Sequence, residues 1–159
     1  MKKTILLMAF VLIGLGAKAQ SSLIKTSPGG LAFGFFNACY EKVINDKSSF
    51  QLSAGFFFSG LETANGESLS AFNVGAGYRF YVTAQEAPRG FYVMPFASFS
   101  SGSGDTNIAI GADLGYQWVW DSGFALDIGL GPAYNIADDT SAFSNGITPS
   151  IVTAVGLAF

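Results

Sequence analysis

The stretch NIAIGADLGYQWVW, residues 107–120, decides the predicted fold because its side chains alternate between two kinds. Its even-numbered positions are mainly large and apolar: Ile108, Ile110, Ala112, Leu114, Tyr116, Trp118 and Trp120. Its odd-numbered positions are small or polar apart from Val119: Asn107, Ala109, Gly111, Asp113, Gly115 and Gln117. A period of two indicates a β-strand whose two faces meet different surroundings.

The same alternation recurs along the chain. It is clear in residues 49–59, 70–82, 123–135 and 148–159, and weaker in residues 31–43 and 91–100. Clusters of Gly, Asn, Asp, Ser and Pro separate these segments, as turns separate strands. After Gln20, no segment keeps a helical period and no apolar run is long enough for a transmembrane helix. The sequence therefore predicts an all-β fold.

The two faces of the predicted strands also differ in side-chain size. The apolar face is large along its whole length, whereas the other face is mostly Gly, Ala, Ser and Asn, which are too small to fill a sandwich core. Small residues suit the inside of a narrow closed barrel whose outer face contacts lipid. Aromatic residues near strand ends would form its girdle: Tyr40, Tyr78, Tyr116, Trp118, Trp120, Tyr134 and Phe159. We therefore expect a closed antiparallel up-and-down transmembrane barrel.

The connections between segments predict about eight strands. The two shortest connections are residues 44–48 and residues 121–122. The two longest are residues 60–69 and residues 136–147. Outer-membrane barrels have short periplasmic turns and long external loops. The strand in residues 31–43 then runs towards the periplasm, so another strand must precede it. Residues 20–27 can supply it, in full or as a short strand, with Pro28-Gly29-Gly30 as an external turn.

The N-terminal segment has the features of a secretory signal peptide. Lys2 and Lys3 precede an apolar run in residues 5–16, and Ala17-Lys18-Ala19 provides a small-residue cleavage site. The run is too short to span a bilayer as a helix. We predict a signal peptide in residues 1–19 and a barrel domain in residues 20–159; an uncleaved anchor is the alternative.

The composition excludes several function classes. The chain has 8 Lys and Arg against 11 Asp and Glu, so it lacks the basic surface of a nucleic-acid-binding protein. It has no histidine and a single cysteine, which excludes an intrachain disulfide, a histidine base and a Cys/His metal cage. A Ser/Asp pair such as Ser98 with Asp113 would lack a suitable general base. We therefore expect a non-enzymatic protein without a cofactor or metal.

Charged residues on the inward face are the main candidate site. Counted from the periplasmic strand ends, Glu41, Arg79 and Asp127 fall in one layer, with Gln117 nearby and Asp113 higher. Arg79 is the only inward cation that the pattern places, and it has three carboxylates as candidate partners. We expect an internal network of ion pairs and hydrogen bonds, because unpaired buried charge is costly. A gated ion path and a small-ligand pocket are the alternatives.

Two further sets of residues are weaker candidates. The predicted external loops carry the carboxylates Glu62, Glu67, Asp105, Asp138 and Asp139. We expect them to be solvated; binding Ca²⁺, or lipopolysaccharide phosphates through divalent ions, is the alternative. Cys39 alternates inward, where a lone thiol usually serves packing.

Five segments and the final strand carry a resemblance to a known family. The ending VGLAF (155–159) resembles the C-terminal targeting strand of Gram-negative outer-membrane barrels. The segments FNACYE (36–41), GYRFY (77–81), GFYVMPF (90–96), GYQW (115–118) and LGPAYN (130–135) together resemble a family of small outer-membrane β-barrels of unknown function. The resemblance implies the fold and the outer-membrane compartment, with lipid, lipopolysaccharide and the barrel-assembly machinery as partners. It implies no activity.

These expectations lead to one main functional hypothesis. The protein would have a structural or surface-interaction role, with its external loops contacting lipopolysaccharide, ligands or other cells. A narrow channel or a small-ligand-binding barrel is the runner-up. A soluble lipocalin-type barrel is a third alternative, and it would place the large apolar residues inside.

Overall fold

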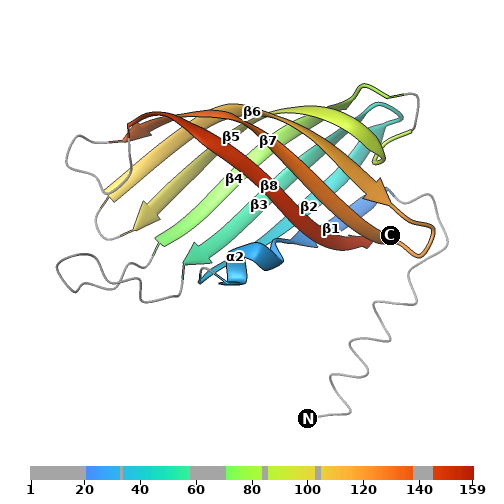
Figure 1. The fold of residues 1–159 in the computed structure, drawn as a ribbon, viewed down its shortest axis with the longest axis horizontal. Coiled ribbons are helices and arrows are strands. Elements are labelled where there is room, and N and C mark those ends of the chain that lie inside the picture. Colours follow the sequence, from blue (N-terminus) through green and yellow to red (C-terminus); the bar gives the residue numbers. More distant parts are fainter. Residues whose placement is uncertain (1–20, 33, 58–70, 84–85, 103–104, 138–144) are drawn as a thin grey trace, which may run out of the picture.

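The computed structural model describes residues 21–32, 34–57, 71–83, 86–102, 105–137 and 145–159. These residues form a closed barrel in which consecutive strands pair antiparallel and β1 closes against β8 (Figure 1). The strands are β1 (Ser22–Thr26), β2 (Phe35–Asn45), β3 (Ser48–Phe57), β4 (Ala71–Tyr81), β5 (Gly90–Gly102), β6 (Asp105–Val119), β7 (Phe124–Ala137) and β8 (Gly146–Ala158). The prediction of an all-β, up-and-down antiparallel barrel of about eight strands is confirmed. The predicted signal peptide lies outside the described residues.

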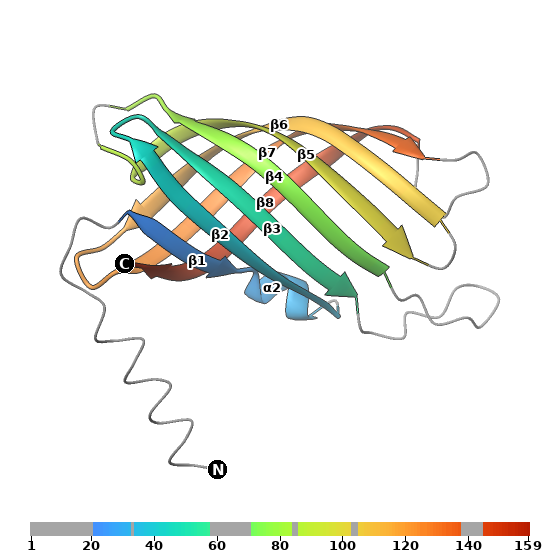
Figure 2. The same cartoon turned by 180° about the vertical axis from the view of Figure 1, so that it is seen from behind.

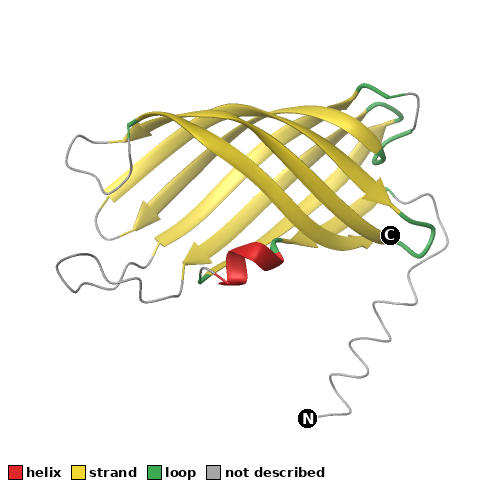
Figure 3. Cartoon of the chain, viewed as in Figure 1, coloured by secondary structure: helices red, strands yellow, loops and turns green. Residues whose placement is uncertain are grey.

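A short helix, α2 (Pro28–Ala32), connects β1 to β2 (Figure 3). The external turn predicted at Pro28-Gly29-Gly30 is therefore wrong, because these residues begin the helix. Proline suits the first helical position, where its fixed φ is already helical. The Ser27 hydroxyl oxygen accepts a hydrogen bond from the Gly30 backbone N–H at 3.4 Å, as an N-cap residue does. Within the described chain, no helix is long and apolar enough to cross a membrane.

The two ends of the barrel differ in their connections (Figure 2). One end, called the turn end, holds residues 46–47, 82–89 and 120–123, together with the start of β1 and the end of β8. Gly123 adopts a φ of 84° there, and its N–H donates to the Trp120 carbonyl, which closes the tight turn predicted at residues 121–122. The opposite end, called the loop end, holds α2, the ends of β3, β5 and β7, and the starts of β4, β6 and β8.

Of the five predicted external carboxylates, the structure describes only Asp105. Glu62, Glu67, Asp138 and Asp139 lie outside the described residues. Asp105 is the first residue of β6, paired across the ladder with Gly102.

Alternating burial sorts the side chains into two faces. The large apolar side chains point outward and are well exposed; Leu130, for example, is 69% exposed and Leu114 is 62% exposed. Their neighbours point inward, and Arg79 and Asp127 are fully buried. This arrangement is the reverse of the one expected for a lipocalin-type barrel, in which the large apolar residues would fill the interior. The buried polar groups of the interior therefore form the candidate site.

Candidate functional site

An ionic cluster crosses the barrel interior near the turn end. It consists of Lys25 on β1, Glu41 on β2, Arg79 on β4, Gln117 on β6 and Asp127 on β7. Each of these residues is at most 2% exposed. The structure thus brings together four of the five residues predicted for the interior network, and it adds Lys25.

Lys25 lies at the centre of the cluster. Its ammonium nitrogen is 2.7 Å from Glu41 Oε2 and 2.8 Å from Asp127 Oδ2. It also donates to Gln117 Oε1 at 2.7 Å and to Gln51 Oε1 at 3.0 Å. An ammonium has three donors, so these four oxygens use its hydrogen-bonding capacity fully. Lys25 is therefore a second inward cation beside Arg79, the one that the sequence pattern places.

Lys25 escaped the sequence pattern because β1 has five residues and alternates poorly. Ser22 and Leu23 are both buried, which breaks the period of two at the start of the strand. The alternation holds only in the next three residues, where Ile24 is 51% exposed between the buried Leu23 and Lys25.

Arg79 joins both carboxylates of the cluster. Its Nη2 is 2.6 Å from Asp127 Oδ2, and its Nη1 is 3.5 Å from Glu41 Oε2. Nη1 also donates to Gln117 Oε1 at 2.7 Å. The guanidinium carbon lies 4.0 Å from the centroid of the Tyr92 ring, a cation–π geometry. Two of the three carboxylates predicted as partners, Glu41 and Asp127, therefore pair with Arg79.

Hydroxyl groups complete the coordination of the two carboxylates. Tyr81 donates to Glu41 Oε1 at 2.7 Å, and Ser49 donates to the same oxygen at 2.5 Å. Tyr92 donates to Asp127 Oδ1 at 2.8 Å. Both oxygens of each carboxylate are thus hydrogen-bonded, which offsets the cost of burying the charges.

The position of Tyr92 explains two interior glycines. A Cβ atom at Gly115 would lie 2.4 Å from the Tyr92 hydroxyl oxygen, and one at Gly129 would lie 2.7 Å from it. The tyrosine can cross the interior only because both positions lack a side chain. Sequence reasoning missed this role, although Phe91 and Val93 on either side of Tyr92 face outward.

The cluster is tied to the connection at the turn end. Gln117 Nε2 donates to the Pro88 carbonyl at 2.9 Å and to the Tyr81 hydroxyl at 3.1 Å. Nearer the strand ends lies a cluster of buried apolar side chains: Leu23, Val119, Ala125 and Ala158. Packed side chains therefore fill the turn end of the interior.

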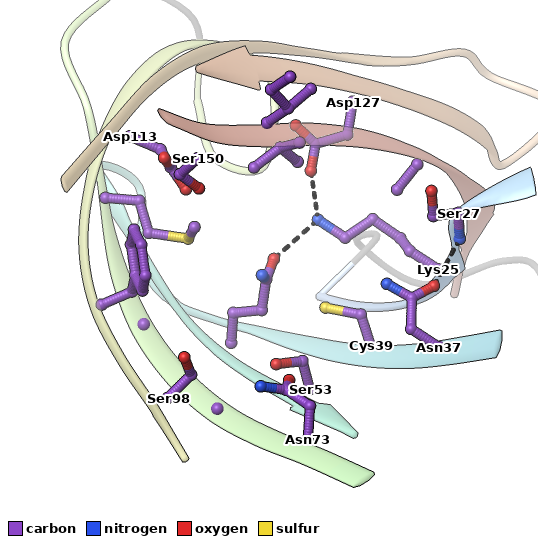
Figure 4. A pocket seen from close by; sticks show the side chains of 18 of the residues that line it. Lys25, Ser27, Asn37, Cys39, Ser53, Asn73, Ser98, Asp113, Asp127 and Ser150 are labelled. Atoms are coloured by element: carbon purple, nitrogen blue, oxygen red, sulfur yellow. Dashed lines mark hydrogen bonds and ion pairs between the residues drawn. The ribbon is translucent and has the colours of Figure 1, made fainter. Parts of the chain in front are cut away.

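A cavity of about 400 Å³ lies on the loop-end side of the ionic cluster (Figure 4). Lys25 and Asp127 contribute to its wall where it meets the cluster. Small polar side chains surround much of the rest: Ser27, Asn37, Ser53, Asn73, Ser98 and Ser150. The void exists because inward positions on neighbouring strands are small, which the sequence predicts. Its volume falls within the range of small-molecule pockets.

Asp113 stands apart from the ionic cluster, as its position along β6 predicts. It is 2% exposed and lines the cavity next to Ser150 (Figure 4). The side chains of the two residues are hydrogen-bonded. Its Oδ1 atom has no hydrogen-bond partner among the described residues. Cys39 also lines the cavity, and its thiol is free and 7% exposed.

The predicted girdle residues fall mainly into a band at the turn end. Tyr116 packs on Trp118 with ring centroids 4.4 Å apart, and Trp120 packs on Phe124 at 5.4 Å. This turn-end band consists of Tyr78, Phe80, Phe91, Tyr116, Trp118, Trp120 and Phe124, and the predicted Phe159 lies beside it after β8. Tyr40, another predicted girdle residue, lies near the middle of β2, and its hydroxyl oxygen is 3.3 Å from the Ser22 hydroxyl oxygen.

A second aromatic band lies towards the loop end. Phe36, Phe56 and Phe72 are level with one another across β2, β3 and β4. Each of them is 46–49% exposed. Together with Phe99 and the predicted girdle residue Tyr134, they form the loop-end band. The sequence places these phenylalanines on the outward face, but only the strand register shows that they are level.

Comparisons of the chain with protein-family models, with curated proteins and with solved structures found no match. Within the described ranges, no group of three or more Cys, Asp or Glu side chains is arranged to hold a metal ion.

Proposed function

We propose that this protein is an integral barrel of the Gram-negative outer membrane with a structural or surface-interaction role. The observation that carries the proposal is the reversed distribution of side chains, with large apolar residues outside and charged residues inside. A continuous apolar exterior of this kind is unfavourable in water and favourable in lipid.

The spacing of the two aromatic bands supports a membrane position. Phe124 and Tyr134 lie ten residues apart on β7, one in each band. At ~3.3 Å per residue and a tilt near 40°, that separation corresponds to about 25 Å along the membrane normal. The apolar belt of outer-membrane barrels has the same height.

The ionic cluster favours a non-conducting and non-enzymatic role. Its charges are paired and hydrogen-bonded across the interior, which argues against the narrow-channel alternative. The sequence contains no histidine to act as a base. Under this proposal the loop end contacts lipopolysaccharide and the cell's surroundings, and the turn end faces the periplasm.

A small-ligand-binding role is the second candidate. The cavity beside Asp113 favours it, because a buried carboxylate oxygen that has no partner among the described residues is an acceptor for a ligand. Of the two runner-up functions expected from the sequence, ligand binding is the one that the geometry supports.

Gel mobility and cell fractionation test the membrane proposal together. The full chain is expressed in a Gram-negative host, and the washed outer-membrane fraction is run on a gel with and without boiling. We expect a compact band in that fraction that migrates more slowly after boiling. Recovery only in the soluble fraction, without a mobility shift, would refute the proposal.

Surface labelling tests the proposed orientation. A peptide tag inserted within residues 58–70 should be detected on intact cells by an antibody, whereas a tag inserted at residues 46–47 should be detected only after the outer membrane is permeabilised. The reverse pattern would contradict the assigned orientation.

A further inference from the structure

The barrel wall is incomplete between β2 and β8. β1 pairs with β2 only from Lys42 to Cys39, and with β8 only from Ala158 to Val155. Towards the loop end, β2 continues to Phe35 and β8 continues to Gly146. On the edges that face each other across the gap, no described strand pairs with residues 35–38 of β2 or with residues 146–154 of β8. We call the gap between them the seam.

The hydrogen-bonding direction of β8 shows that its seam edge is open. The N–H of Phe159 donates to Ser22, whereas the N–H of Ala158 donates to Gly123. Backbone N–H groups point alternately to the two sides of a strand. The N–H groups of the odd-numbered residues of β8 therefore point towards β1 and the seam. Pro149 is one of these residues, so the strand has no N–H at that point of its open edge. Proline within a sheet is characteristic of such edges.

Helix α2 and a few polar side chains cover the seam. α2 contacts both β2 and β8. The Ser27 N–H donates to Asn37 Oδ1 at 2.7 Å, and the hydroxyls of Ser27 and Thr153 lie 3.3 Å apart. A helix of five residues opens more easily than a strand ladder does.

The interior cavity reaches the seam. Ser27, Gly30 and Phe35 line it from the β1–α2–β2 side. From the other side, five consecutive residues of β8, 150–154, line the same cavity. Consecutive residues of a strand point to opposite faces, so this lining includes the open edge of β8 as well as its inner face.

The seam lies within the apolar belt proposed for the membrane. Ile147 is level with Tyr134 of the loop-end band, and Ile151 is level with Leu130 nearer the middle of the barrel. Open sheet edges facing hydrocarbon are not tolerated unless their polar groups are covered or line a cavity. An occupant of the seam therefore has to be apolar towards the lipid and polar towards the cavity.

The charges of the interior indicate the polar group of that occupant. Among the described residues, the buried charged side chains are Lys25 and Arg79 against Glu41, Asp113 and Asp127. The carboxylates exceed the cations by one, and Asp113 makes none of the ion pairs in the ionic cluster. Its Oδ1 atom also lacks a hydrogen-bond partner. A cationic hydrogen-bond donor satisfies both deficits, whereas an anion adds to the excess.

We propose that the seam is a lateral doorway, covered by α2, through which a single-chain amphiphile with a cationic head group enters the cavity from the bilayer. Its head group lies at Asp113, and its chain runs past Phe35 and residues 151–154 into the lipid. This inference rests on the proposed membrane location of the barrel.

Access of reagents to Cys39 tests the doorway. Cys39 is the only cysteine of the chain and lines the cavity, so its labelling reports entry. The protein is reconstituted in phosphatidylcholine vesicles and exposed to an N-alkyl maleimide dissolved in the bilayer or to a short water-soluble polyethylene glycol maleimide. We expect the bilayer-dissolved reagent to label Cys39 at least ten times faster.

A disulfide across the seam provides the decisive variant. A Cβ at Gly29 would lie 3.7 Å from Thr153 Oγ1, so the pair Gly29→Cys and Thr153→Cys is close enough to bridge. In the oxidised variant, labelling of Cys39 should slow at least tenfold, and reduction of the disulfide should restore it. The matched control is Ala54→Cys with Val74→Cys, an outward pair level across β3 and β4, which should change the rate less than twofold.

Two probes of similar chain length test the head group. Dodecylamine should slow labelling of Cys39 at least fivefold in the unmodified protein, and dodecanoate should not slow it. Asp113→Asn should remove the protection by dodecylamine. Equal protection by both probes, or by neither, would overturn the assignment of the head group in a way that does not depend on any variant.

Separate outcomes distinguish failure of the doorway from failure of the membrane proposal. Protein that does not float with the vesicles would refute the membrane location. If the protein floats and shows the boiling-dependent mobility shift, the doorway is overturned by any of three results. The first is an unchanged labelling rate of Cys39 in the oxidised Gly29→Cys and Thr153→Cys variant. The second is an equal labelling rate for the two maleimides. The third is that Cys39 is not labelled in the folded protein but is labelled in denatured protein.

Discussion

Replacement of Lys25 by methionine should destabilise the barrel far more than a typical change in a five-residue strand. The side chain keeps similar length and loses its charge. Glu41 Oε2 and Asp127 Oδ2 each lose an ammonium that lies within 2.8 Å. Arg79 then remains as the one cation facing both carboxylates.

The magnitude follows from breaking a buried ion network on one side. Removing one partner of such a network costs about 3–5 kcal/mol, because it leaves buried charge uncompensated. A second substitution, Glu41→Gln, removes the excess carboxylate and leaves Arg79 paired with Asp127. The double variant should therefore be more stable than the sum of the single effects implies, by about 1–3 kcal/mol.

Urea unfolding in vesicles measures both quantities. The folded fraction is followed by the boiling-sensitive gel band and by the fluorescence of Trp118 and Trp120, whose side chains are exposed on the outer face. Lys42→Met is the matched control, since Lys42 neighbours Glu41 on β2 but points outward, and it should cost less than about 1 kcal/mol. A loss below about 1 kcal/mol for Lys25→Met, or strict additivity in the double variant, would refute the central role of Lys25.

Two further predictions concern the packing and closure of the interior. Gly115→Ala should destabilise the barrel by about 1–3 kcal/mol in the same unfolding assay, because the new methyl group overlaps Tyr92. Gly29→Ala is the control: the nearest contact of its new methyl group is 3.7 Å away, so it should change stability by less than about 1 kcal/mol. Equal effects of the two substitutions would contradict the assigned packing. The purified protein should add no discrete current steps to a planar bilayer, because the ionic cluster crosses the interior, and steps that change with Arg79→Ala would instead establish a channel.

The alternation of large and small residues predicts most of the fold and part of the candidate site. It correctly assigns Arg79, Gln117 and Asp127 to the interior, since these residues lie in long strands where a period of two leaves no ambiguity. It fails for Lys25 because β1 is short and its first two residues are both buried. The helix that begins at Pro28 was missed for a different reason, since glycines next to a proline also suit a turn.

The seam could not be predicted from periodicity. It depends on how far β1 extends relative to β2 and β8, and pairing partners are a property of the closed barrel rather than of any one segment. Pro149 was a local signal of an open edge, but its meaning depends on knowing which neighbour its nitrogen faces. Likewise, only the arrangement of β6 and β8 around the same cavity shows that Asp113 Oδ1 has no hydrogen-bond partner in the described part of the chain.

Arginine substitutions at two heights test the membrane claim most directly. Leu114 and Leu130 are level with each other near mid-height, and Ile108 and Ile136 are level with each other near the loop end. All four side chains are 47–69% exposed. In a membrane barrel, arginine at either leucine should cost about 2–4 kcal/mol, and at either isoleucine about 0–1 kcal/mol. Costs near zero at all four positions, as expected for exposed residues in water, would contradict a lipid-facing exterior.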